Sequence, residues 1–201
     1  MTNLHSDVER FWDVFLIGGA SGTGKTHAAY ALARHFGTGL AEVDDFHTVL
    51  EAMTTPEQQP ELHYWNTNPD AHEMTAEDIV ALHVSVARIM LPAFRAVITN
   101  HVEERTPVVL EGDYLLPELL TQDENAWQHG RVRGVFLYDS QEQIVNNFLE
   151  REPEEGEQTG RAHVSWLFGE WLREECARHK VPALAARPWN TLQKRILDAI
   201  S

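Results

Sequence analysis

Short apolar runs alternate with segments of helical spacing along most of the chain. The runs at 14–17, 108–110 and 132–138 are rich in Val, Leu, Ile and Phe and predict buried strands. Weaker runs at 40–43 and 181–185 predict a second and a fifth strand in chain order. The pattern therefore predicts a sheet with both faces covered.

The segments between these strands carry apolar residues at helical spacing. In the longest, apolar positions recur from Ile79 to Val97 after Thr75, a residue type that caps helices, and Pro92 is expected to kink or split this helix. Gly37 is a natural helix stop. The other predicted helices span 25–36, 117–122, 141–151, 162–179 and 189–200.

Alternating strands and long crossovers predict an α/β fold: a parallel sheet with helices on both faces. In such folds ligands bind beyond the carboxyl ends of the strands. These ends are 18–25, 44–47, where the chain is expected to turn, 111–113, 139–140 and 185–187.

The first of these strand ends fits the phosphate-binding loop pattern G-x-x-x-x-G-K-[ST] at every fixed position. Its glycines allow backbone N–H groups to converge on an anion, and the following helix adds its positive dipole end. Lys25 is predicted to reach the outer phosphates, and the Thr26 hydroxyl to bind Mg²⁺. The residues predicted to hold ATP here are Gly19, Ala20, Ser21, Gly22, Thr23, Gly24, Lys25, Thr26 and His27.

Composition narrows the class of protein. The 201 residues suffice for one α/β domain, and the net charge of −15 disfavours a nucleic-acid partner, because phosphate backbones attract basic surfaces. The single cysteine, Cys176, precludes an internal disulfide, and the start of the chain lacks an apolar signal core. No run approaches the ~18–20 apolar residues of a membrane span. We therefore expect a cytoplasmic protein, a monomer or homodimer without a membrane partner.

Four stretches resemble the small P-loop kinases of the nucleoside-monophosphate-kinase-like group. They are GGASGTGKT, DDFH at 44–47, VVLEGDYLLPEL at 108–119 and RGVFLYDSQEQIVNNFLER at 133–151. DDFH is similar to the Asp-containing turn of gluconate and uridine kinases, and VVLEGDYLLPEL resembles 2-phosphoglycerate kinase-like proteins. The resemblance implies the three-layer P-loop nucleoside triphosphate hydrolase fold, with strand order 2-3-1-4-5, a small lid and phosphotransferase activity.

Acidic residues at two strand ends are the candidates for catalysis. Asp45 is the first choice for the base that deprotonates an acceptor hydroxyl, and Asp44 the second; an Asp pair that only stabilises a turn is the alternative. Glu111 fits a position near Mg²⁺, acting through water. Asp113 is expected to serve the metal or the substrate, or to stabilise the turn after Gly112.

The acceptor and lid segments complete the predicted site. We expect an acceptor-side segment at 46–74 and a lid at 151–163, in which Arg151 and Arg161 either close over the phosphates or form a salt-bridged surface. The resemblance places Arg187 near the adenine. The residues predicted to contact the acceptor are Asp45, His47, Tyr64, Trp65, Glu111 and Asp113.

These residues predict one domain that transfers the γ-phosphoryl group of ATP, with Mg²⁺, to a hydroxyl of a small metabolite. One alternative is an antibiotic or nucleotide-sugar phosphotransferase, similar to chloramphenicol phosphotransferase or zeta toxins. The other is a regulatory ATP-binding module. A GTPase is excluded because the chain has no Asn-Lys-x-Asp motif.

Overall fold

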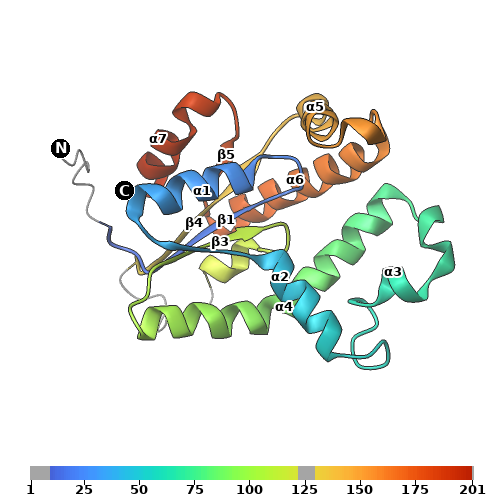
Figure 1. Ribbon diagram of the computed structural model, residues 1–201, viewed down its shortest axis with the longest axis horizontal. Coiled ribbons are helices and arrows are strands. Elements are labelled where there is room, and N and C mark those ends of the chain that lie inside the picture. The colour runs from blue at the N-terminus through green and yellow to red at the C-terminus, as the bar shows by residue number, and fades with distance from the viewer. Residues whose placement is uncertain (1–9, 122–129, 201) are drawn as a thin grey trace.

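The structure is a computed structural model, and it describes residues 10–121 and 130–200. Its centre is a parallel sheet of five strands in the order β2-β3-β1-β4-β5, as the resemblance implied (Figure 1). The strands are β1 (Val14–Gly19), β2 (Gly39–Glu42), β3 (Val108–Gly112), β4 (Val132–Tyr138) and β5 (Ala183–Ala185).

Helices cover both faces of this sheet. In Figure 1 the α1 and α7 ribbons lie on one side of the strands, and α4 lies on the other. The α-helices are α1 (Lys25–Phe36), α2 (Val43–Met53), α3 (Tyr64–Thr67), α4 (Ala76–Glu103), α5 (Gln141–Arg151), α6 (Thr159–His179) and α7 (Trp189–Ile200). The described 3₁₀ helices are η1 (Pro69–Glu73), η2 (Pro117–Leu120) and η4 (Pro153–Glu155).

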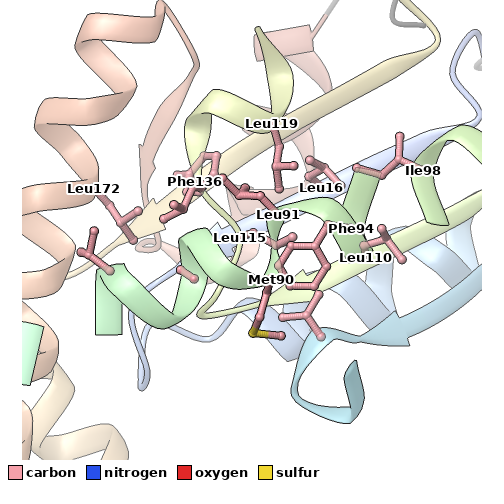
Figure 2. Packing of buried hydrophobic residues seen from close by; sticks show 14 of the residues in the cluster. Leu16, Met90, Leu91, Phe94, Ile98, Leu110, Leu115, Leu119, Phe136 and Leu172 are labelled. Carbon is pink, nitrogen blue, oxygen red and sulfur yellow. The ribbon is translucent and has the colours of Figure 1, made fainter. Parts of the chain in front are cut away.

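The central strand β1 divides the core into two parts. Its alternate residues Val14 and Leu16 pack toward α4 and α6, whereas Phe15 and Ile17 pack toward α1 and α7. Figure 2 shows the first part, in which Met90, Leu91, Phe94 and Ile98 of α4 meet the sheet and its neighbours. This two-sided burial explains the continuous apolar runs of the strands.

Helix α4 bears on two expectations. It is one helix and is not split at Pro92, because Pro92 lies on the exposed face, where water can solvate a carbonyl that lost its partner, while Met90 and Phe94 hold the buried face. By length and apolarity it also passes as a membrane span, although no such run was expected. Its buried face packs against the sheet, as in the core helix of a soluble protein.

The segment at 44–47 is a further correction. The chain was expected to reverse direction here, but Asp44 and Asp45 lie in the first turn of helix α2. This helix begins directly after β2. Carboxylates in the first turn interact favourably with the helix dipole, and Val43 is fully buried at the helix start. These two effects stabilise a helix here, although polar residues of this kind are typical of turns. Thr75, by contrast, caps α4 as predicted, accepting a hydrogen bond from the Asp78 amide.

Candidate functional site

The phosphate-binding loop joins β1 to α1 and is closed by its own hydrogen bonds. The Thr23 hydroxyl and the Lys25 ammonium both donate to the Ala20 carbonyl, at 2.8 and 2.9 Å. Gly22 and Gly24 have φ angles of 77° and 79°, a backbone conformation that residues other than glycine rarely adopt. The loop is thus a compact turn whose conformation depends on glycine.

Two side chains from distant helices fasten the loop from outside. The Asn147 amide of α5 donates to the Gly22 carbonyl at 2.7 Å, and the Ser165 hydroxyl of α6 donates to the Ser21 carbonyl. Asn147 also accepts a 3.0 Å hydrogen bond from Arg187. The two contacts with the loop span more than a hundred positions of sequence, so no local pattern could have predicted Asn147 or Ser165.

A cleft of about 710 Å³ opens in front of the loop, at the carboxyl edge of the sheet. Residues from five segments far apart in the sequence meet around it. They are Ser21, Gly22, Gly24, Lys25, Thr26, His27, Glu42, Asp44, Glu111, Gly112, Asp113, Asn147, Glu150, Arg151, Arg187 and Trp189.

Lys25 is bound by an acidic neighbour within this cleft. Its Nζ lies 2.5 Å from Asp113 Oδ1, and the lysine side chain is 6% exposed. Burial raises the pKa of Glu111, opposed by a hydrogen bond with Thr26 and by the Lys25 charge. Burial and the neighbouring Asp113 also raise the pKa of Asp44, opposed by Lys25. The carboxylates and the lysine therefore act on one another electrostatically.

The donors near the loop suit Mg²⁺. The Thr26 hydroxyl and the carboxylates of Glu111 and Asp44 face the same cleft, and oxygen is the ligand atom that Mg²⁺ prefers. Across 10–121 and 130–200, no three His, Cys, Asp or Glu side chains are grouped as a metal site. Mg²⁺ usually takes one or two carboxylates together with substrate phosphates.

The two predicted base candidates are separated by the geometry of α2. Asp44 lines the cleft, whereas its neighbour Asp45 is not among the lining residues. Successive residues of a helix point about 100° apart, so only one of the two faces the phosphate loop. The structure thus brings Asp44, Glu111 and Asp113 to the cleft and leaves Asp45 outside it.

Three of the predicted acceptor residues, His47, Tyr64 and Trp65, are not on the wall of this cleft, whereas Glu111 and Asp113 are. His47 stacks on Tyr114 with ring centroids 5.0 Å apart, and His83 also stacks on Tyr114, with ring centroids 4.5 Å apart. Trp65 lines a small cavity of about 40 Å³ with His47 and Tyr114, and Tyr64 packs edge-on against Trp65. Sequence reasoning missed Tyr114 and His83, whose roles arise only from this stack.

Burial shapes the titration of the stack. It lowers the pKa of His83, despite the Asp113 carbonyl 3.3 Å from its Nε2. Burial, with Asp44 and Asp113 nearby, raises the pKa of Tyr114 to about 12. Tyr114 therefore stays a neutral phenol at physiological pH.

The predicted lid arginines share one carboxylate. Arg151 and Arg161 each lie 2.7 Å from a Glu152 oxygen, and both guanidinium groups stack over Phe148. Hydrogen bonds from Gln158, then from the two arginines, lower the pKa of Glu152 to about 2. Arg151 lines the cleft, whereas Arg161 lines a neighbouring cavity.

Arg187 and Trp189 form the remaining wall. The guanidinium lies 5.3 Å from the Trp189 ring, and the ring packs on Gly24 so closely that a Cβ there would lie 1.8 Å from it. Trp189 therefore fixes the loop from the α7 side and requires glycine at this position.

Comparison with known proteins places the fold. No protein-family model matches the chain, and no curated protein matches it significantly in sequence. A gluconokinase from Sinorhizobium meliloti 1021 superposes with a TM-score of 0.54 at 18% identity, over 96% of this chain and 93% of that one. A shikimate kinase from Acinetobacter baumannii in complex with shikimate gives a TM-score of 0.50 at 17% identity, over 94% and 93%. The fold is that of the P-loop small-molecule kinases, as the resemblance predicted.

Proposed function

We propose that the protein is an ATP-dependent phosphotransferase that moves the γ-phosphoryl group to a hydroxyl of a small metabolite. One observation supports this most: the phosphate loop opens onto a cleft whose other wall carries Asp44, Glu111 and Asp113. A nucleotide sensor needs the loop, but it has no need of an acceptor base beside it. Phosphoryl transfer needs both, for positioning and for proton removal.

The loop residues would bind the nucleotide. Backbone N–H groups of 22–26 would hold the β-phosphate, and Lys25 would leave Asp113 to reach the γ-phosphate. Thr26, with Glu111 through water, would hold Mg²⁺, which neutralises charge on the phosphates when bound. The Trp189 ring and Arg187 would line the adenine end.

Asp44 is the proposed base. Its carboxylate would take the proton of the acceptor hydroxyl as that oxygen bonds to the γ-phosphorus, and the bond to the β–γ bridging oxygen breaks to release ADP. Its raised pKa makes it a stronger proton acceptor than an ordinary aspartate. Arg151, at the cleft rim, would stabilise the charge of the transferring group.

An acceptor panel with radiolabelled [γ-³²P]ATP and MgCl₂ tests the proposal. The panel holds polyols, sugars, amino sugars, sugar phosphates, an aminoglycoside and the acids gluconate and shikimate, which the names of the two structural neighbours suggest. We expect labelled product with at least one hydroxyl compound. If ATP binds but no compound is labelled, and a partner protein binds only in the presence of nucleotide, the protein is a regulatory module instead.

A further inference from the structure

The distribution of positive charge is uneven around the cleft. No lysine or arginine occurs between Arg34 and Arg88, whereas ten aspartates and glutamates do. This stretch includes β2, α2, α3 and the start of α4, and its β2 and α2 supply the cleft wall that carries Glu42 and Asp44. All 16 lysines and arginines of the chain lie within the described ranges 10–121 and 130–200.

The lysine and arginine side chains that line the cleft lie where the nucleotide is proposed to bind. Lys25 belongs to the phosphate loop, and Arg151 and Arg187 enter from α5 and from the segment before α7. Arg161 lines a cavity of about 110 Å³ together with Asp113 and His83, but its charge is paired with Glu152. Phosphate groups of a nucleotide would therefore use these cations first.

The small cavity beside the acidic wall is acidic or neutral. The adjoining cavity of about 40 Å³ is lined by Glu61, His47 and the neutral Tyr114, with the half-exposed Trp65 at its edge. A carboxylate or phosphate placed here would meet no lysine or arginine and would face the Glu61 carboxylate, with Asp44 and Asp113 on the wall of the cleft. Like charges placed together in an interface are strongly unfavourable.

We propose that the phosphoryl acceptor is an alcohol without a carboxylate or phosphate group, a polyol or an amino alcohol, and that the acidic wall from Glu42 to Glu61 rejects acidic substrates. The inference rests on the proposed phosphotransferase function and narrows its substrate class. It also separates this chain from kinases whose acceptors are acids, although the fold is shared.

Four six-carbon compounds of similar size test the charge preference: glucitol, glucosamine, gluconate and glucose 6-phosphate. We expect kcat/KM for glucitol or glucosamine to exceed that for each acid by at least ~100-fold. The first two also distinguish a neutral from an amine-bearing acceptor. Thermal shifts of the complex with Mg²⁺ and a non-hydrolysable ATP analogue measure the same preference without turnover.

A charge change at the acidic wall provides the second test. Glu61→Lys adds a cation beside the acceptor space. It should lower the ratio of kcat/KM for non-acidic acceptors to kcat/KM for acidic acceptors by ~10-fold or more, and Glu61→Gln should lower this ratio less. Trp65→Lys, at a side chain 54% exposed, is the second cation variant should Glu61→Lys not fold.

The outcomes separate the two claims. An acid as the best acceptor, or a ratio that no cation variant moves, overturns the inference and leaves the proposed function standing. Absence of transfer to every compound, although MgATP binds, overturns the proposed function and the inference with it.

Discussion

Lys25 and Asp113 form a close ion pair, with Nζ 2.5 Å from Oδ1, inside the cleft that the phosphate loop opens onto. The lysine of the phosphate loop is therefore held by a carboxylate that directly follows β3. In the mechanism we propose, a nucleotide would have to displace Asp113 from Lys25, and Asp113 could then face the acceptor.

Asp113→Asn should consequently tighten MgATP binding. Loss of a partly buried pair that binding has to break is expected to contribute ~1 kcal/mol, or about five-fold in Kd, measured by calorimetry. Asp45→Asn removes the same charge outside the cleft wall and serves as the control. The interpretation fails if Asp113→Asn tightens binding equally when Lys25 is already replaced by Met, because then the lysine is not involved.

The choice of Asp44 as base predicts a pH dependence. Its pKa is raised above the ordinary 3.8, and the base must be unprotonated to act, so kcat/KM should fall as pH falls through that raised pKa. Asp44→Asn should abolish this acid limb and lower kcat by ~10²–10⁴-fold. Asp45→Asn should keep both the limb and the rate within ~2-fold; the opposite ranking of these two variants would make Asp45 the base.

Asn147 is predicted to position the phosphate loop. Asn147→Ala removes the amide that donates to the Gly22 carbonyl and accepts from Arg187, so MgATP binding should weaken by ~1 kcal/mol, about five-fold. The exposed neighbour Asn146 offers a matched control on the same helix. Equal effects of the two alanine variants would show that the loop does not depend on Asn147.

The contact between Gly24 and Trp189 predicts an unequal response of two glycines. Gly24 and Gly37 both have positive φ, so alanine strains each by ~1–2 kcal/mol, but nothing lies within 4 Å of a Cβ at Gly37. Gly24→Ala must also displace the Trp189 ring, which adds ~1–3 kcal/mol. In thermal unfolding, the melting temperature of Gly24→Ala should lie well below that of Gly37→Ala. Adding Trp189→Ala to Gly24→Ala should restore part of the lost stability. Equal melting temperatures would contradict the packing.

Much of this fold could be predicted from local patterns. The phosphate loop has a fixed spacing, and the strands and helices around it bury residues at periods of two and 3.6. Helices 25–36, 141–151 and 189–200 have the bounds that their apolar spacing predicted. The sheet order followed from the resemblance and is confirmed.

The errors and omissions have physical causes. The Asp44–His47 segment looked like a turn because aspartate favours turns, but helix-dipole stabilisation and the burial of Val43 favoured a helix. The side-chain contacts of Asn147, Tyr114 and Trp189 join elements far apart in the chain. Such contacts leave no periodic signal in the sequence, so only the folded structure reveals them.

The measurement that bears most directly on the central claim is transfer of label from [γ-³²P]ATP to the acceptor panel by the wild type and by Lys25→Met, which keeps the buried aliphatic stem. We predict a labelled acceptor with the wild type and a loss of at least ~10³-fold in kcat/KM with Lys25→Met, at unchanged secondary structure. Equal transfer by both proteins would contradict phosphoryl transfer at this loop.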